Sequence, residues 1–184
     1  MSYALAVYYI VVPAELTSNL ARYDGIKYGT SAPGATLSDV YANSRTAGFM
    51  DENKRRILIG NYVLSSGYYD AYYTTALKVR RLIKNEFDAA FEQCDVILGP
   101  TSPTAAFKLG EKTDNPLAMY LSDIYTISCN LAGIAGMSIP CGFTKSNLPV
   151  GLQLLSPAFD EDRMFRIARM YEAATDWHTK RPVV

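Results

Sequence analysis

The hydrophobic positions of the chain recur mostly at the spacing of α-helices, with three short apolar runs that have the form of strands. Residues 3–20 fit either structure. Their valines and isoleucine favour a strand, whereas Ala4, Tyr8 and Val11 repeat at helical spacing. Pro13 limits a helix here, because proline lacks an amide hydrogen and clashes with the preceding turn. We interpret the stretch as a helix that kinks or restarts at this proline.

Three further helices are predicted between residues 38 and 93. The first begins at Ser38, a residue type that caps helix N-termini, and ends at about residue 47. The second begins at Asp51, and its apolar spacing predicts a buried face made of Ile57, Leu58, Tyr62 and Leu64. The third is the longest, over about residues 67–93, where apolar side chains keep an i, i+3, i+4 rhythm.

The C-terminal half alternates between strands and helices. A short apolar run at 96–98 predicts a strand that ends in a Gly-Pro turn. A helix over about 117–131 comes next, followed by two strands in "GMSIPCGF" and "VGLQLLS". A last helix is predicted over about 160–175, with Asp160 as its N-cap. Helices around a few buried strands place the chain in the α/β class.

The stretch "LSSGYYDAYY", residues 64–73, holds four tyrosines beside two serines. It fits either a nucleophile beside an aromatic wall or a helix that packs its tyrosines. In a helix, Tyr68 and Tyr72 share one face, and Tyr69 and Tyr73 share another. No histidine lies nearby in the sequence, so packing is the favoured interpretation.

Composition narrows the classes of function. The 184 residues are 49% hydrophobic and 20% charged, which is typical of a globular domain rather than a disordered chain. Eighteen Lys and Arg balance eighteen Asp and Glu, and acids are interleaved with the short basic clusters. A nucleic-acid-binding surface needs clustered, unneutralised cations, so the sequence argues against direct nucleic-acid binding.

Cysteine, histidine and the apolar N-terminal stretch indicate a cytoplasmic protein without a metal site. The three cysteines lack CxxC spacing and the only histidine, His178, has no cluster of ligands around it in the sequence. The opening "MSYALAVYYIVV" lacks the basic n-region of a signal peptide and is too short to span a membrane, which takes about 20 residues. We expect reduced thiols, a cytoplasmic location and no membrane association.

Four stretches together resemble one enzyme family: "YYIVVPAELTSNLARYDGIKYG", "LSSGYYDAYYTTALKVRRLI", "DVILGPTSPTAAF" and "NLAGIAGMSIPCGF". In order, they are similar to the C-terminal portion of the amidase-signature enzymes. Within that family they resemble the A subunits of amidotransferases that act on glutamyl-tRNA(Gln) or aspartyl-tRNA(Asn). The resemblance extends over essentially the whole chain. It implies a single, partial amidase domain over residues 1–184, with a mixed sheet of few strands flanked by several helices.

The catalytic signature of that family has no counterpart in this sequence. The resemblance implies a Ser–cis-Ser–Lys triad on a Gly/Ser-rich region that precedes the portion seen here. No such region occurs in the sequence, and "LSSG" at 64–67 matches the tyrosine-rich helix instead of the nucleophile. We therefore expect no catalytic residue in this chain and no activity from this chain alone.

The resemblance assigns three residues to a pocket for glutamine. Arg56 would bind the α-carboxylate, Asp123 the α-ammonium group, and Tyr8 would add a hydroxyl. A guanidinium suits a carboxylate because it offers two parallel N–H donors. Sequence position alone favours other roles, namely a solvated helix face for the arginine, a helix N-terminus for the aspartate and core packing for the tyrosine.

The resemblance also implies the assembly around this chain. The glutaminase component would hydrolyse glutamine through a seryl intermediate, and the ammonia would pass to a B subunit that uses ATP and magnesium to amidate misacylated tRNA. A small C subunit would wrap the glutaminase component, so tRNA is an indirect partner and this chain needs no cofactor or metal of its own. Two alternatives stay open: the same portion of a stand-alone amidase, and a non-catalytic interaction module.

Overall fold

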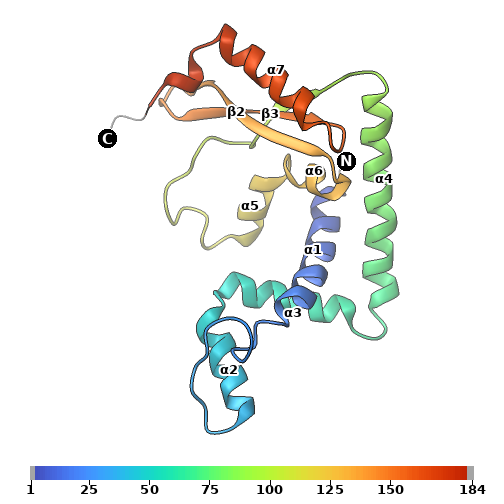
Figure 1. Ribbon diagram of the computed structural model, residues 1–184, viewed down its shortest axis with the longest axis vertical. Coiled ribbons are helices and arrows are strands. Elements are labelled where there is room, and N and C mark those ends of the chain that lie inside the picture. Colours follow the sequence, from blue (N-terminus) through green and yellow to red (C-terminus); the bar gives the residue numbers. More distant parts are fainter. Residues whose placement is uncertain (1–2, 182–184) are drawn as a thin grey trace. The chain divides into compact units, whose positions relative to one another are not determined.

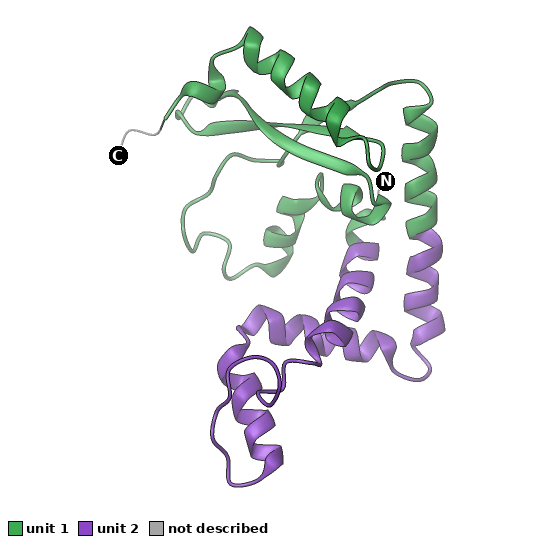
Figure 2. Cartoon of the chain, in the orientation of Figure 1, with its two compact units in different colours: residues 1–5, 80–184 green, residues 6–79 purple. Residues whose placement is uncertain are grey.

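The structure, a computed structural model, describes residues 3–181. By their internal contacts they form two compact units, unit 1 with residues 3–5 and 80–181, and unit 2 with residues 6–79 (Figure 2). Figure 1 gives the order of the helices and strands, which confirms the α/β class. Within the described residues, no helix combines the length and the apolar character that a membrane crossing requires.

Residues 4–74 contain four helical segments: α1 (Ala4–Leu20), α2 (Leu37–Gly48), α3 (Asp51–Leu64) and the π-helix η1 (Tyr69–Thr74). The helical interpretation of the first segment is confirmed, and Pro13 lies inside it with its side chain fully buried. Val7, Val11 and Ala14 are also buried. The valines that fitted a strand thus form the buried face of a helix.

Helix α2 begins slightly earlier than predicted. Its N-cap is Thr36, whose Oγ1 accepts a hydrogen bond from the amide of Asp39 at 3.2 Å. The carboxylate of Asp39 accepts one from the amide of Thr36 at 2.9 Å. This reciprocal pair satisfies two amides that the helix leaves free, so the prediction of Ser38 as the cap is wrong.

Helix α3 begins at Asp51 as predicted, but it buries a different face. Leu58 is 69% exposed and Tyr62 is also exposed, whereas Gly60 and Val63 are buried. The reason is a close approach of α1. A Cβ atom on Gly60 would lie 2.1 Å from the backbone oxygen of Pro13. Only a glycine therefore fits at this position of α3, where the helix meets the backbone of α1.

The single long helix expected over residues 67–93 is observed from Tyr69 to Phe91, but its first six residues form a π-helix. Gly67 has a φ of +87°, η1 follows, and α4 (Thr75–Phe91) begins only after the tyrosine-rich segment. The rings of Tyr62, Tyr68 and Tyr72 lie 4.4 to 6.4 Å apart, and no residue of η1 is buried. A hydrogen bond with Tyr68 raises the pKa of Tyr62 to about 12. These phenols pack on one another at the surface.

Unit 1 is built on a three-stranded sheet in the order β1-β3-β2, formed by β1 (Ile97–Pro100), β2 (Ala135–Phe143) and β3 (Pro149–Ser156). The predicted strands are therefore confirmed, but the Gly-Pro turn expected at the end of the first is not, because Gly99 and Pro100 belong to β1 and pair with β3. The resemblance led us to expect mixed strand directions, but these three strands pair only antiparallel. The short connection between β2 and β3 accounts for one of the two pairings, since two strands joined by a tight turn run in opposite directions.

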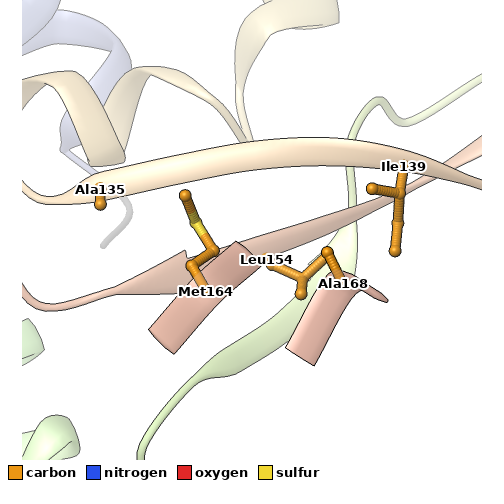
Figure 3. Packing of buried hydrophobic residues seen from close by; sticks show 5 residues of the cluster. All are labelled: Ala135, Ile139, Leu154, Met164 and Ala168. Atoms are coloured by element: carbon orange, nitrogen blue, oxygen red, sulfur yellow. The ribbon is translucent and has the colours of Figure 1, made fainter. Parts of the chain in front are cut away.

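One face of the sheet packs against α7 (Glu161–Ala174), the helix that was predicted over about 160–175. Figure 3 shows side chains from β2, β3 and α7 meeting in one apolar cluster, namely Ala135, Ile139, Leu154, Met164 and Ala168. All five are buried. The short helix η3 (Trp177–Thr179) follows α7, and Trp177 contacts Phe143 of β2 edge to face. Alternate residues of β2 and β3 therefore face this core, and the residues between them face the other side.

The helix predicted over 117–131 is three separate pieces: α5 (Pro116–Tyr120), η2 (Leu121–Asp123) and α6 (Ile127–Ala132). Helix α6 lies on the opposite side of the sheet from α7 (Figure 1). It ends at Gly133, which has a left-handed φ of 65°. A Cβ atom on Gly136 of β2 would lie 2.7 Å from Sγ of Cys129, so a glycine in the strand lets α6 approach the sheet closely.

We expect Gly60→Ala to lower the stability of the protein, although alanine is the better helix former by about 1 kcal/mol. The added methyl group would meet a backbone carbonyl at 2.1 Å, and overpacking of this kind costs about 1–3 kcal/mol. Gly48→Ala is the matched control, because nothing lies within 4 Å of its Cβ position. Thermal unfolding followed by circular dichroism measures both, and equal melting temperatures for the two variants would contradict the contact.

Candidate functional site

Arg56 differs from the two cations that precede it on α3. Its side chain is 21% exposed, against 40% for Lys54 and 50% for Arg55. Its Nε donates a hydrogen bond to Glu52 at 2.8 Å, and its guanidinium lies 5.4 Å from the centre of the Tyr9 ring. The side chain is therefore folded back towards α1, and the solvated position that its sequence neighbours suggest is not observed.

The charge around Arg56 remains positive. Glu52 forms an ion pair with both Arg55 and Arg56, so one carboxylate is shared by two guanidinium groups. Burial lowers the pKa of Arg56, but hydrogen bonds with Glu52 and Tyr8 outweigh it and raise the pKa above its usual value. One carboxylate and two guanidinium groups leave a net positive charge, so the group can attract and hold an anion.

Tyr8 lies beside Arg56. The hydrogen bond between the two joins α1 to α3. The Tyr8 ring also meets that of Tyr9 edge to face, with 5.2 Å between centroids. Tyr8 is half-buried, whereas the core positions of α1 are its valines and alanines. The structure thus brings together two of the three predicted pocket residues, both of which belong to unit 2.

Asp123, the third predicted residue, belongs to unit 1 and ends η2. Its backbone oxygen accepts hydrogen bonds from the amide and from Oγ1 of Thr126, each at 3.0 Å. Its carboxylate is exposed and has no hydrogen-bond or ion-pair partner within residues 3–181. The N-cap of α6 is Thr126, so the carboxylate does not serve the helix N-terminus that its sequence position suggests. Within that part of the chain, it is free to bind a cation.

Hollows open on the face of the sheet that α7 leaves uncovered, and two of them share part of their lining. The larger, of about 750 Å³, lies between the loop that follows β1 and the ends of β2 and β3. The smaller, of about 220 Å³, reaches under α6. Thr101 and Ser138 line both, with their hydroxyl oxygens 2.7 Å apart. Ser102 and Thr104 line the larger hollow.

The lining of the smaller hollow is polar but neutral. Its polar side chains are those of Thr101, Thr126, Asn130, Ser138 and Gln153. The one thiol in the lining is Cys129, and burial raises its pKa, which disfavours the thiolate that a nucleophile requires. Hydroxyl and amide groups of this kind hold and orient a polar partner. Across residues 3–181, no three His, Cys, Asp or Glu side chains gather closely enough to bind a metal.

Sequence reasoning missed the polar residues of the sheet. Ser138 and Gln153 stand alone among apolar neighbours in two runs that predict strands. A single polar residue inside an apolar strand is a signal, because burying it without a partner is costly. What the sequence could not provide is the face of the sheet on which each one lies.

Comparison with known proteins gives a consistent result. The amidase family model matches residues 1–165. The A subunit of glutamyl-tRNA(Gln) amidotransferase from Thiobacillus denitrificans is 58% identical over 180 residues, and its counterpart of the same name from Heliobacterium modesticaldum is 61% identical over 181. These alignments cover 97% and 98% of this chain but only 37% of each relative. The chain therefore spans little more than a third of the curated relatives it matches.

Solved structures give the same result as the sequence comparisons. The crystal structure of the glutamyl-tRNA(Gln) amidotransferase A subunit from Thermotoga maritima is 41% identical, with a TM-score of 0.60 over 91% of this chain and 31% of that one. A crystal structure described as an amidase is 17% identical, with a TM-score of 0.67 over 93% of this chain and 35% of the other. The second likeness shows a shared fold and nothing more specific.

We expect Asp123→Asn to leave stability unchanged to within about 0.5 kcal/mol, as is usual for exposed surface positions. The carboxylate caps no helix in residues 3–181, and the backbone oxygen keeps its bonds to Thr126. Asp39→Asn is the informative contrast, because it weakens the capping box of α2 and should cost about 1 kcal/mol. Thermal unfolding compares the two, and a marked loss for Asp123→Asn would assign the carboxylate a structural role.

Proposed function

This chain belongs to the amidase family, and from that premise we propose that it supplies the glutamine-binding part of a glutaminase subunit in a tRNA-dependent amidotransferase. The observation that carries the proposal is Arg56, an enclosed cation held by Glu52, Tyr8 and Tyr9. Relatives that are 58% and 61% identical are, by name, A subunits of glutamyl-tRNA(Gln) amidotransferase. The parent protein is accordingly proposed to be an enzyme.

Arg56 is proposed to bind the α-carboxylate of glutamine. A guanidinium has five N–H donors, and the hydrogen bonds with Glu52, from Nε, and with Tyr8 use only part of them, so further N–H groups can face a ligand. The positive net charge of the cluster favours an anion, and the hydroxyl of Tyr8 adds a further polar contact beside it. An enclosed, already oriented arginine loses little side-chain entropy when the ligand binds.

Asp123 is proposed to bind the α-ammonium group. Its carboxylate is exposed and has no partner within the described part of the chain, so binding a cation breaks no ion pair there. A carboxylate also repels a second carboxylate, which would favour an amino acid over a dicarboxylate. With both ends of the amino acid fixed, the side-chain amide is held in one orientation for attack, which contributes to catalysis by lowering the entropy lost on the way to the transition state.

The remainder of the reaction is proposed to lie outside this chain. We place the Ser–cis-Ser–Lys triad in the part of the enzyme that the chain does not span, and the neutral hollows on the sheet agree with this division of roles. Ammonia from glutamine would pass to a B subunit that uses ATP and magnesium to amidate Glu-tRNA(Gln) or Asp-tRNA(Asn), with a C subunit in the same complex. The assembly is proposed to act in the cytoplasm, and tRNA to contact this chain only indirectly.

In the complete amidotransferase, we expect Arg56→Ala to lower kcat/KM for glutamine by roughly a hundredfold, because a bidentate charged contact is worth a few kcal/mol. Amidation driven by added ammonia should stay within about twofold, since it does not use the glutamine pocket. Arg55→Ala is the matched control: it removes the neighbouring guanidinium, which shares Glu52 but is more exposed. Equal losses of both activities would mean that Arg56 maintains the fold.

The purified chain alone should release no ammonia from glutamine above the rate of a blank. None of the neutral groups lining its hollows is an activated nucleophile, and the Cys129 thiol is disfavoured as a thiolate. Ammonia is measured by a coupled dehydrogenase assay before and after a second purification. Turnover that survives the second purification would place a nucleophile within these residues and contradict the proposed division of roles.

A further inference from the structure

Gln153 is a polar residue enclosed in the middle of β3. It is only 6% exposed, and its neighbours Leu152 and Leu154 belong to the apolar side of the sheet. Its Nε2 donates a hydrogen bond to the backbone oxygen of Tyr125 at 3.2 Å. Its Oε1 is buried and has no hydrogen-bond partner within residues 3–181. A buried amide with only one end satisfied calls for a physical explanation.

The Nε2 bond reaches the segment that carries Asp123. Tyr125 lies two residues after Asp123, and the bond joins residues 28 positions apart. Other bonds here come from the segment itself or from the loop before it: the amide of Ile124 donates to Leu121, the amide of Thr126 donates to Asp123, and Nζ of Lys112 donates to Ser122. Local bonds fix the shape of a turn, but they do not hold it against the sheet. The bond from Gln153 does, and it acts next to the exposed carboxylate.

The side chain of Gln153 lies on the side of the sheet that α7 leaves uncovered. It lines both the hollow under α6 and an apolar hollow beside β1. The first, of about 220 Å³, also carries the polar side chains of Thr126, Asn130 and Ser138. It has room for several water molecules, each of which takes about 30 Å³. A water molecule or another O–H or N–H donor there would hold the amide from its second end, and an unsatisfied acceptor is destabilising.

We propose that Gln153 is a positioning residue for Asp123, acting through the backbone of Tyr125 to keep the carboxylate at the place where it meets the α-ammonium group of an amino-acid substrate. The inference rests on the proposed function. A carboxamide suits this role because it donates from one end and accepts at the other without carrying a charge into a buried position. Methionine has the same length but neither function, and glutamate keeps the acceptors while losing the donor.

The test uses the complete amidotransferase complex, with Gln153→Met and Gln153→Glu as the variants. Two binding quantities are measured: the KM for glutamine, and the inhibition constant of 4-carbamoylbutanoate, which is glutamine without the α-amino group. Leu155→Met is the matched control, because Leu155 lines the same hollows on the same strand, has no polar side-chain atom and changes little in volume. Neither constant depends on the fraction of molecules that fold.

Both Gln153 variants should raise the KM for glutamine about tenfold, the scale of one lost hydrogen bond, and leave kcat within about threefold. The inhibition constant of the analogue should stay within about twofold of its original value, because the analogue has no ammonium group for Asp123 to bind. The Leu155→Met control should leave both constants unchanged. An equal loss for glutamine and for the analogue, or a Gln153→Glu enzyme with the original KM, would overturn the proposal.

A double-mutant cycle separates this inference from the function on which it rests. If Gln153 acts through Asp123, adding Gln153→Met to Asp123→Asn should raise the glutamine KM by less than about twofold. If the two residues act independently, Gln153→Met should raise the KM as much in the Asp123→Asn enzyme as in the original enzyme. Full additivity overturns the positioning role. An unchanged glutamine KM in the Asp123→Asn enzyme overturns the role proposed for Asp123. A raised KM in Asp123→Asn together with an unchanged KM in Gln153→Met overturns only the inference about Gln153.

Discussion

The backbone contact between α1 and α3 at Gly60 is the constraint on which the arginine side of the site depends. The glycine lets the two helices touch where any side chain would meet the carbonyl of Pro13. Thr17 strengthens the same contact, since its hydroxyl donates to the backbone oxygen of Ile57 at 2.7 Å. One turn of α3 away, this approach brings Arg56 against the tyrosines of α1. A cation that its sequence neighbours would leave in solvent is thereby enclosed.

The two groups proposed to bind glutamine differ in charge and in exposure to solvent. Arg56 is oriented in advance by an ion pair and by aromatic neighbours, so it can receive a carboxylate at little entropic cost. Asp123 is exposed, and its placement depends on the backbone around it and, as we propose, on the amide of Gln153. A zwitterionic amino acid needs both kinds of group. Neither group is a nucleophile, which agrees with a part that binds substrate for a catalytic apparatus located elsewhere.

Local pattern was sufficient to predict much of the fold. The strands β2 and β3 and the helix α7 follow from apolar spacing and turn residues, whereas the spacing in α1 fitted either a helix or a strand. The pattern failed where a distant contact decided the outcome: Leu58 was expected inside, but the Gly60 contact turns another face of α3 inward. In the site, too, some features could be predicted from the sequence and others depend on a distant contact. Family resemblance singled out Arg56 and Asp123, whereas the role proposed for Gln153 depends on Tyr125, a partner that spacing along the chain does not reveal.

The most direct test of the proposed binding site is a crystal structure of the complete amidotransferase with glutamine bound. We predict that the terminal N–H groups of Arg56 lie about 2.7–3.2 Å from the α-carboxylate and that the carboxylate of Asp123 lies within the same range of the α-ammonium group. Tyr8 should contact the ligand or the arginine that holds it. Glutamine bound at a place that neither Arg56 nor Asp123 reaches would contradict the proposed roles of both residues.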